Sequence, residues 1–587
     1  MASLHTFEIP QAGICVLTLA ASFCISAAAQ IPAQDARNTT IPGTDTHFTM
    51  PVYKTRAEWE ARKQHLRYQI LSAAGLLPMP EKTPLHPLIF GRLERKGYTI
   101  EKVALETLPG YYLAGNLYRP RTPGKHPALL SPHGHWSYGR LENSERASVP
   151  LRCINLARLG FVVFAYDMVG YDDTTQTPHA FGGPREQLWS FGPLGLQLWN
   201  STRAIDFLQS LPDVDAEKIG GTGASGGATQ LILISAVDPR IKFSAPVNMI
   251  SAIMQGGSPC ENAPSLRVGT NNMEFGAMMA PRPMFMVSAT GDWTRNTPRE
   301  EYPAVRSIYE LYDAASKLEM TQITAPHNYN KETREAVYRY FGPKILDITD
   351  PTALREHNAA IESLHDMLVW HERTLPPNAL TYDQIAEEWI AAAKKQNEAT
   401  TDAAEFRLRL MYALSAEWPA RVLSETHGHD VLLGRPGKGD RIAAIETASN
   451  PHTIVVHPDG AEAARDVTSE PALLVTVFQT GHAIAPRDRS AKFFLTFNKT
   501  DDAERVQDIL TAVAYLTEHG VRNPHLIGVG KAGLWCRFAA AVAPVPVQLD
   551  APAAVDFTGS DQDFIDKFFV PGIQRAGGVH AAMLLTH

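Results

Sequence analysis

Apolar and polar positions follow two different periods along the first half of the chain. Arg56–Leu77 has apolar residues at helical spacing and leads into a stretch rich in Gly and Pro, which predicts a helix. Beyond it, short apolar runs bounded by turn residues alternate with amphipathic runs, as expected for buried strands joined by helices. This alternation predicts an open α/β sheet of mostly parallel strands with helices on both faces. The predicted strands are His126–Gly134, Phe161–Gly170, Ile241–Ile250, Arg282–Asp292 and Leu318–His327, and the predicted helices include Leu151–Gly160 and Ser201–Leu211.

Composition and charge narrow the class of protein. The chain has 587 residues, of which 44% are hydrophobic and 20% are charged, as in a soluble protein of two or three domains. Its formal net charge is −8 and it has no long basic run, which argues against nucleic acid as a partner. Beyond the N-terminal region, no stretch is long and apolar enough to span a bilayer.

The N-terminal stretch Gly13–Ala29 is apolar and ends in three alanines before Gln30, a pattern typical of a signal peptide with a small-residue cleavage site. The positive charges that usually precede such a stretch are missing, because the first Lys or Arg is Arg37. An uncleaved anchor or a wrongly assigned start codon therefore stays open as an alternative. We expect a signal peptide over residues 1–29, cleavage after Ala29, and a secreted or periplasmic protein.

The cysteines do not suggest a disulfide scaffold. Once a signal peptide is removed, Cys153, Cys260 and Cys536 remain, widely spaced and odd in number. Their spacing matches no metal-binding motif. We therefore expect buried free thiols, no metal and no cofactor.

A possible nucleophile lies in the stretch Lys218–Val237, whose centre reads Gly-Ala-Ser-Gly-Gly around Ser225. The G-x-S-x-G pattern alone is weak, since two glycines and a serine often occur together by chance. Its context strengthens the pattern, because a short apolar approach precedes Ser225 and a helix-like run follows, as in a strand-to-helix nucleophile elbow. Small neighbours also allow the close backbone approach and strained dihedral angles of such a turn. Ser225 is therefore predicted to be a catalytic nucleophile.

Several motifs form an ordered set along the chain. They are a strand followed by His-Gly-His-Trp, a strand running into Tyr-Asp-Met-x-Gly, a helix, Gly-Ala-Ser-Gly-Gly, a strand ending in Gly-Asp, and a last strand followed by His. Over about Tyr53–Leu375 this set resembles the α/β-hydrolase superfamily. It is most similar to the secreted acetyl xylan esterase and cephalosporin deacetylase-like branch, near the dienelactone hydrolases. The resemblance implies an α/β-hydrolase fold and a carbohydrate ester as substrate.

The resemblance and the chemistry together select candidate catalytic residues. A serine hydroxyl needs a base that takes its proton and an acid that orients the base. In α/β-hydrolases these groups follow in the order Ser, acid, His, and His327 comes directly after the last predicted strand. Asp292 ends the preceding strand, which is the usual family position of the acid. Glu261, in the loop before that strand, is the alternative acid, because some secreted carbohydrate esterases draw the acid from this loop.

Acyl transfer also needs hydrogen-bond donors for the developing oxyanion. The resemblance implies the backbone N–H of Gly226, which follows the nucleophile, and that of His135 in the loop after an earlier strand. The acidic run that holds Asp167, Asp172 and Asp173 lacks the spacing of a calcium loop, and in similar hydrolases this segment is a structural loop. We therefore predict no metal site there.

Four side chains are candidate substrate-binding groups. For the residues of the His-Gly-His-Trp loop, a purely structural role in shaping the turn stays open. For the arginine, a solvated surface position stays open, although its charge would suit a carboxylate-bearing substrate. The four candidates are His133, Trp136, Trp293 and Arg295.

The second half of the chain repeats the apolar pattern of the first. Aligned on its glycines, His525–Val542 resembles the elbow, and Ala532 falls where Ser225 stands. Too little chain follows for the usual acid and histidine loops. We expect a degenerate, truncated α/β-hydrolase-like domain over 421–587, a catalytic domain over 30–375 and a helical connector over 376–420, although a chance likeness between two α/β sheets stays open. The other matching pairs are Pro451–Gly460 with His126–Gly134, Pro471–Gly481 with Phe161–Gly170, and Ile509–Gly520 with Asn200–Leu211.

These observations predict a secreted serine esterase that removes acetyl groups from a plant polysaccharide such as xylan through an acyl-enzyme. The rival substrate is a methyl ester of a uronic-acid polysaccharide, of the pectin or glucuronoyl type. A serine peptidase of the prolyl-oligopeptidase type is a second alternative, but no propeller-like repeat precedes the catalytic part. A non-catalytic carbohydrate-binding pseudoenzyme is the third. The expected partner is the ester-substituted carbohydrate itself.

Overall fold

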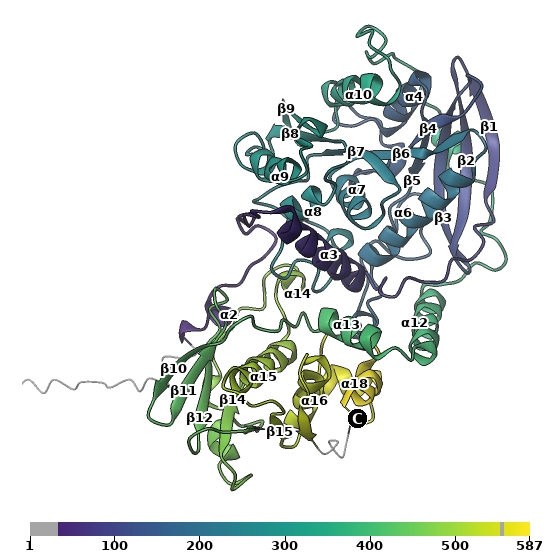
Figure 1. Ribbon diagram of the computed structural model, residues 1–587. Coiled ribbons are helices and arrows are strands. Elements are labelled where there is room, and N and C mark those ends of the chain that lie inside the picture. The colour runs from purple at the N-terminus through teal and green to yellow at the C-terminus, as the bar shows by residue number, and fades with distance from the viewer. Residues whose placement is uncertain (1–32, 552–556, 587) are drawn as a thin grey trace, which may run out of the picture.

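The computed structural model describes residues 33–551 and 557–586, which form two α/β units (Figure 1). We call residues 48–375 the first unit and residues 421–586 the second unit. The predicted signal peptide lies outside the described residues and stays a prediction. Of the helices that are described, none combines the length and the apolar character needed to cross a membrane.

The first unit is built on a nine-stranded sheet with the order β1-β2-β3-β5-β4-β6-β7-β8-β9. The pairs from β5 to β9 are parallel, whereas β1, β2, β3 and β5 pair antiparallel. The carboxyl ends of the parallel strands therefore meet at one edge of the sheet. The strands are β1 (Leu88–Arg95), β2 (Tyr98–Leu108), β3 (Tyr111–Pro120), β4 (His126–Leu130), β5 (Val162–Tyr166), β6 (Val214–Ala224), β7 (Ile241–Val247), β8 (Met284–Gly291) and β9 (Leu318–Pro326).

Helices cover both faces of this sheet. They are α3 (Arg56–Ala73), α4 (Val149–Leu159), α5 (Pro184–Leu188), α6 (Pro193–Ser210), α7 (Gly226–Val237), α8 (Asn272–Ala277), α9 (Glu301–Glu310), α10 (Lys331–Ile345) and α11 (Leu364–Met367), with 3-10 helices η1 (Gly139–Leu141), η2 (Pro259–Glu261) and η3 (Ala315–Lys317). One apolar core joins the sheet to α3, α6, α7 and α9, and a second core joins its other face to α4 and α10. The layered arrangement predicted from the alternating pattern is thus confirmed.

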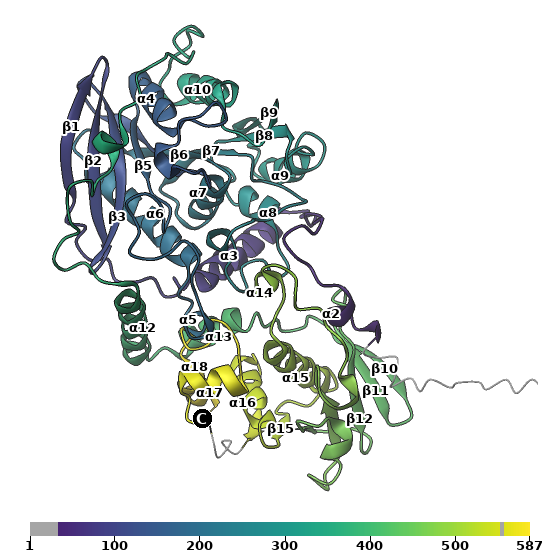
Figure 2. The ribbon, with the colours of Figure 1, turned by 180° about the vertical axis from the view of Figure 1, so that it is seen from behind.

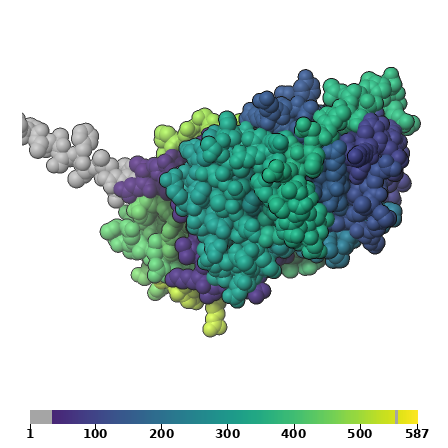
Figure 3. Space-filling view, turned by 90° about the horizontal axis from the view of Figure 1, so that it is seen from above, coloured from purple at the N-terminus to yellow at the C-terminus, as the bar shows by residue number. Residues whose placement is uncertain are grey.

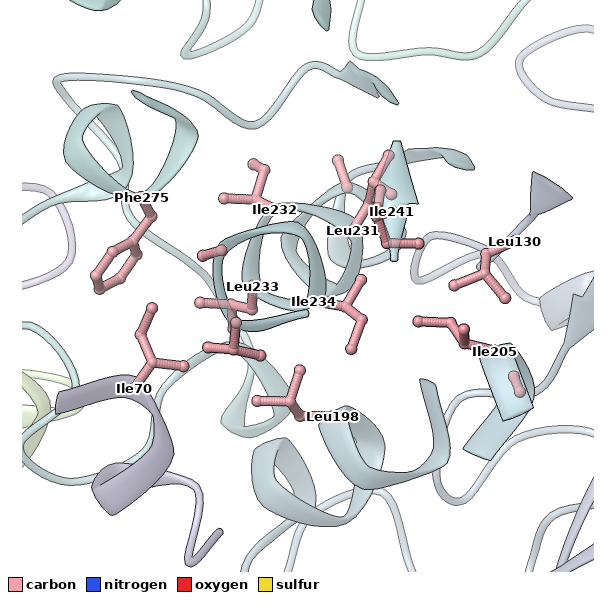
Figure 4. Packing of buried hydrophobic residues seen from close by; sticks show 14 of the residues in the cluster. Ile70, Leu130, Leu198, Ile205, Leu231, Ile232, Leu233, Ile234, Ile241 and Phe275 are labelled. Carbon is pink, nitrogen blue, oxygen red and sulfur yellow. The ribbon is translucent and has the colours of Figure 1, made fainter. Parts of the chain in front are cut away.

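Helix α7 is buried along its whole length, which explains why its sequence is apolar on every side. Figure 4 shows its residues Leu231, Ile232, Leu233 and Ile234 packed among side chains of neighbouring elements. These include Leu198 and Ile205 of α6, Ile70 of α3, Phe275 of α8 and Leu130 of β4. This packing fixes the start of α7, and with it the turn that carries Ser225.

The sequence pattern located the parallel strands but missed the antiparallel ones. Each of the five predicted strands is present, shortened by one to five residues at its ends. The strands β1, β2 and β3 were not predicted, although Lys96-Gly97 and Pro109-Gly110 mark the two turns between them. Gly97 and Gly110 both have positive φ, of 87° and 69°, as such tight turns require.

The second unit contains a seven-stranded sheet with the order β10-β11-β12-β14-β13-β15-β16. Strand by strand, this order and its pattern of antiparallel and parallel pairs are those of β1 to β7. Counterparts of β8 and β9, after which Asp292 and His327 stand, are absent from the described residues. The strands are β10 (Leu423–His427), β11 (Asp430–Gly434), β12 (Ile442–Glu446), β13 (Thr453–Val456), β14 (Ala472–Thr476), β15 (His525–Gly528) and β16 (Gln548–Asp550).

The elbow-like turn of the second unit differs from the one at Ser225. In the second sheet Val456 pairs with Gly528, and in the first sheet Leu130 pairs with Gly221. If these two pairs are equivalent, Ala532 is the residue of the second unit that corresponds to Ser225. Ala532 is, however, the buried first residue of α16, and the positive φ of 54° falls on Gly530 instead. The helices here are α14 (Phe494–Phe497), α15 (Asp501–Glu518), α16 (Ala532–Val542), α17 (Asp561–Lys567) and α18 (Gly578–Thr586), with η4 (Ala461–Ala464) and η5 (Gly481–Ala483).

The two units share a broad boundary. Helices α12 (Tyr382–Ala399) and α13 (Ala403–Ala413) connect them, and both views in Figures 1 and 2 place α13 between α3 and the second sheet's helices. Leu188 and Trp189 of the first unit belong to the apolar core of the second. Seen from above, the first unit hides most of the second (Figure 3). The second unit is therefore packed firmly against the first.

The first described residues pack on the second unit, far from their neighbours in sequence. Helix α2 (Ala36–Thr39) lies beside β10 and β11 in Figure 1, and the Ala36 N–H donates to Gly439 O at 2.9 Å. Arg37 donates to the buried carboxylate of Asp508 at 2.6 Å and stacks over Phe478 at 4.3 Å. The segment then crosses to the first unit. We refer to residues 33–41 as the N-terminal strap.

Candidate active site

Ser225 lies in a strained turn between β6 and α7. Its φ of 57° and ψ of −128° are rarely adopted by a residue with a side chain. The turn is possible because glycines on both sides allow close backbone approach. A Cβ on Gly227 would lie 2.5 Å from Pro132 O, and one on Gly223 would lie 2.8 Å from backbone atoms of Gly227. The turn therefore has the strained strand-to-helix geometry that a nucleophile elbow requires.

Asp292 and His327 form a buried pair at the ends of β8 and β9. Their Nδ1 and Oδ2 atoms are 2.8 Å apart, and the side chains are only 10% and 2% exposed for His327 and Asp292. The other oxygen of Asp292 accepts hydrogen bonds from the N–H and the hydroxyl of Thr294. With its Nδ1 proton directed to Asp292, His327 has Nε2 left as an acceptor, and this buried atom has no partner among the described residues.

The loop after β7 ties the elbow to the histidine loop. The Ser225 N–H donates to Val247 O at 3.2 Å. The next residue, Asn248, donates through Nδ2 to Asn328 O at 3.0 Å and accepts from the Trp293 indole N–H at 3.0 Å. Asn248 has a φ of 57° and is buried. The sequence analysis missed this positioning residue, because its only signal is an Asn at a strand exit, where αL conformation is common.

Glu261 occupies a capping position. Its Oε1 accepts from the Thr229 hydroxyl at 2.8 Å, and its Oε2 accepts from the N–H groups of Gly257 and Ser258. These three donors hold the carboxylate between η2 and α7, and it makes no hydrogen bond to His327. Of the two candidate acids, Asp292 is the one in contact with the histidine.

His135 packs directly over the start of α7. A Cβ on Gly226 would lie 2.5 Å from His135 Cε1, so the imidazole rests against that glycine's backbone. The N–H groups of Gly226 and His135 have no hydrogen-bond acceptor among the described residues. Burial lowers the pKa of His135, while the Glu261 carboxylate opposes this shift. The two N–H groups are thus available to a ligand at the elbow.

His133 has no polar atom to offer to a substrate. It is fully buried, its Nδ1–H donates to Gly134 O at 2.8 Å, and its Nε2 accepts from the Met168 N–H at 2.9 Å. Burial lowers its pKa to about 3, so the ring is neutral. Its placement fits the structural reading, in which it shapes the turn.

Two tryptophans and an arginine surround His327. The rings of Trp293 and Trp136 lie 4.3 and 6.0 Å from the imidazole, centroid to centroid. Arg146 donates through Nε to the carbonyl oxygen of His327 at 2.7 Å and lies 5.5 Å over Trp136. Its guanidinium is exposed, and no carboxylate of the described residues comes within 4.0 Å of it. Arg146 was missed in the sequence because nothing marks its loop as close to His327.

The predicted cation, Arg295, is also exposed, but its contacts are weaker. Its guanidinium lies 3.4 Å from the carbonyl oxygen of Asp292, and its backbone carbonyl accepts from Gln322. Among the described residues it forms no cation–π pair with either tryptophan, whereas Arg146 forms one with Trp136. Arg146 is therefore the better-positioned positive charge at the histidine.

The acidic run is occupied by an internal arginine. Arg140 is fully buried and bonds to Asp167, to Asp173 at 2.5 Å and to Asn116 at 2.8 Å, with Asp172 at 3.6 Å. A buried guanidinium among these carboxylates takes the place that a cation would need. The run is consistent with a structural loop.

Comparison with known proteins relates the chain to hydrolases and esterases. No family model matches the chain. "Putative hydrolase YtaP" of Bacillus subtilis (strain 168) is 26% identical over 306 residues, which are 48% of this chain and 97% of that protein. The solved structure of Methylesterase BT1017 is 31% identical with a TM-score of 0.51, and the match covers 59% of this chain and 78% of that one. A glucuronoyl esterase from Solibacter usitatus is 14% identical with a TM-score of 0.38, over 54% of this chain and 99% of that one.

Proposed function

Because the chain belongs to the family of Methylesterase BT1017 and is an esterase with the α/β-hydrolase fold, we propose that it cleaves a carbohydrate ester through an acyl-enzyme on Ser225. One observation carries the proposal. The buried Asp292–His327 pair leaves Nε2 unpartnered at the same sheet edge as the strained Ser225 turn. Nucleophile, base and orienting acid then follow in the chain order expected for this fold.

In the proposed reaction the Ser225 hydroxyl attacks the acyl carbon while His327 Nε2 takes its proton, and Asp292 stabilises the imidazolium. The N–H groups of Gly226 and His135 stabilise the oxyanion. His327 then gives the proton to the alcohol oxygen as its bond to the acyl carbon breaks. Water, deprotonated by the same histidine, cleaves the acyl-enzyme and releases the acid.

The positive charge beside His327 favours one class of ester over the other. The sequence alone favours acetyl groups on xylan, with uronate methyl esters as the rival. A uronate methyl ester puts the sugar on the acyl side, where free carboxylates of the polymer would suit a cation. Arg146 offers such a cation, and the related protein Methylesterase BT1017 is named as an enzyme that acts on methyl esters. We therefore favour the methyl ester of a uronic-acid polysaccharide and treat acetylated xylan as the rival.

Product analysis tests both parts of the proposal. We expect the full chain to release methanol from methyl-esterified pectin or a glucuronoyl methyl ester faster than acetate from acetylated xylan. Ser225→Ala should lose both activities by several orders of magnitude and should no longer react with a fluorophosphonate probe. Labelling of Ser225→Ala at the wild-type rate would refute the nucleophile, and acetate release without methanol would return the substrate to xylan.

A matched pair of variants tests the role of the arginine. Arg146→Gln keeps an N–H donor for the His327 carbonyl but removes the charge, and Arg295→Gln is the control on the same side of the site. A charge-assisted hydrogen bond contributes about 1.5–3 kcal/mol, so KM for a uronate methyl ester should rise roughly 10- to 100-fold in Arg146→Gln. KM for a neutral acetylated substrate should stay within a factor of about two. If KM for the uronate methyl ester rises no more in Arg146→Gln than in Arg295→Gln, Arg146 has no specific role in substrate recognition.

We further propose that the second unit carries out no chemistry, because Ala532 has no hydroxyl and its turn lacks the strained geometry of Ser225. We also propose that the predicted signal peptide exports the protein and that the domain limits are those given above.

The peptidase and pseudoenzyme alternatives make distinct predictions in the same assay. A peptidase would cleave peptide substrates in preference to esters, and a pseudoenzyme would bind polymer without releasing methanol or acetate.

A further inference from the structure

A cluster of two histidines and a cysteine lies beside the predicted oxyanion hole, and the side chains of these three residues take no part in the proposed reaction. His135 comes from the loop after β4, His179 from the segment before α5, and Cys260 from η2. Each contributes one metal-ligating atom, and these atoms all lie within 4.8 Å of one another. The sequence could not reveal this cluster, because the residues come from three separate loops.

The contacts show which atoms face the centre of the cluster. His135 Nε2 lies 3.1 Å from Cys260 Sγ. His179 Nε2 lies 3.0 Å from the Ser258 hydroxyl, which is in turn 3.7 Å from Cys260 Sγ. Two imidazole nitrogens, a sulfur and a hydroxyl oxygen thus surround one small volume.

The protonation of His179 is already set in the form that a metal ligand needs. Its Nδ1–H donates to the carbonyl oxygen of Val169 at 2.7 Å, so Nε2 carries the lone pair. Metal-binding histidines commonly donate their other N–H to a backbone carbonyl in this way, which fixes both the ring and the tautomer.

The dimensions suit a tetrahedral ion after small side-chain rotations. With bonds of about 2.0–2.1 Å to nitrogen and about 2.3 Å to sulfur, a tetrahedral zinc ion separates its ligand atoms by roughly 3.3–3.6 Å. The His135 Nε2–Cys260 Sγ distance of 3.1 Å is close to that range, and the remaining pairs of ligand atoms lie within 4.8 Å. Thiolate and imidazole ligands select zinc-like ions over magnesium or calcium, which prefer oxygen.

We propose that His135, His179 and Cys260 bind one Zn²⁺ ion, with the position next to Ser258 left for a water or the hydroxyl. The carboxylate of Glu261, the neighbour of Cys260, adds negative charge close to the ion. Because the His135 ring rests on Gly226, the ion lies next to the elbow but uses none of the residues proposed to carry the acyl transfer through their side chains.

Binding must displace a proton from the thiol. The ordinary pKa of a cysteine thiol is about 8.5, so near neutral pH it is mostly protonated in the absence of an ion. On metal binding the S–H proton goes to solvent and a sulfur–zinc bond forms, with no change of oxidation state. Zinc affinity should therefore rise with pH, with about one proton released for each ion bound.

The test uses the full chain, stripped with a chelator and titrated with Zn²⁺ against a chromophoric competitor. Co²⁺ provides an independent readout, because a thiolate ligand gives it a charge-transfer band. We expect one ion per chain, and a loss of affinity of at least about 100-fold in Cys260→Ser and His179→Ala, since each removes one ligand. Cys536→Ser removes a buried free thiol in the second unit, and His365→Ala disrupts an exposed histidine group, so both controls should bind normally.

Thermal unfolding shows whether each variant is folded. If His179→Ala does not fold, His179→Gln is tested in its place. The proposal is overturned if the wild-type chain binds less than about a fifth of an ion, if Co²⁺ shows no thiolate band, or if the two ligand variants bind like the controls. Ser225→Ala should bind zinc as wild type does. Failure of the esterase proposal and failure of the zinc proposal are therefore separable.

Discussion

Replacing Asp292 with Asn tests the orienting acid, and the structure allows its effect to be estimated. One oxygen of Asp292 accepts two hydrogen bonds from Thr294, and the other accepts the Nδ1 proton of His327. An asparagine can turn its oxygen to only one of these sides. If the oxygen faces Thr294, the NH₂ group faces Nδ1 and forces the histidine proton onto Nε2, where it blocks proton transfer from Ser225.

The opposite orientation keeps the productive tautomer but sets the NH₂ group against two donors of Thr294. Each buried donor left without an acceptor costs about 1–3 kcal/mol, so this orientation is disfavoured by roughly 2–6 kcal/mol. At about 1.4 kcal/mol per factor of ten, the productive form falls to between about 1/30 and 1/20,000 of the molecules. We expect kcat to fall by a comparable factor, and the same change in the Ser-His-Asp template costs about 10⁴.

The assay is kcat on one soluble ester substrate, with Glu261→Gln as the matched control. Glu261 caps η2 and does not contact His327, so Glu261→Gln should keep kcat within about tenfold and lower the denaturation midpoint, as loss of a cap does. The reasoning is refuted if Asp292→Asn retains more than about a tenth of wild-type kcat. A larger loss in Glu261→Gln than in Asp292→Asn would move the acid to the earlier loop.

Three further changes have defined outcomes. Gly226→Ala places a Cβ 2.5 Å from His135 Cε1, so the imidazole ring must move. Because this displaces the proposed oxyanion donors, kcat should fall about 10²-fold or more, and kcat and KM are measured together on one soluble ester. Arg140→Met leaves buried carboxylates without their cation and should lower the free energy of unfolding by about 3–5 kcal/mol in urea denaturation. Burial lowers the pKa of Lys499 to about 8, so at pH 7 the folded state carries a charged lysine at a free-energy cost relative to the unfolded chain. Lys499→Met should therefore stabilise the protein at pH 7, and the gain should vanish by about pH 10–11, where the unfolded lysine also loses its proton; an equal gain at both pH values would contradict this.

The parallel part of the fold could be predicted because each of its strands is a continuous apolar run between turn residues. The strands β1 to β3 could not be predicted because their apolar residues alternate irregularly with charged ones, as in "GRLERKGYTIEKV". Their clearest signals in the sequence are the two glycine turns. The order Ser225, Asp292, His327 was visible because each residue follows a strand. Whether these three residues carry catalysis stays a prediction.

Contacts between loops could not be predicted. Asn248, Arg146 and His179 each matter through a partner more than 30 residues away in the chain, and no period or motif encodes such a meeting. The second elbow shows the same limit in another form. Its glycines align Ala532 with Ser225, and the sheet register agrees, yet the backbone places the positive φ at Gly530. The positive φ therefore falls on a glycine, which adopts it without strain, and not on the residue that the alignment equates with Ser225.

The N-terminal strap has a consequence for the order in which the protein can be completed during synthesis. Arg37 and its partner Asp508 are 471 residues apart. At about 5–20 residues per second, roughly half a minute to a minute and a half separates the emergence of these two residues from the ribosome. The first unit can fold in that interval, whereas the strap reaches its binding partners only after the second unit has been synthesised. A deletion through residue 41 should therefore impair maturation of the C-terminal half of the molecule, the half farthest from the deletion in sequence.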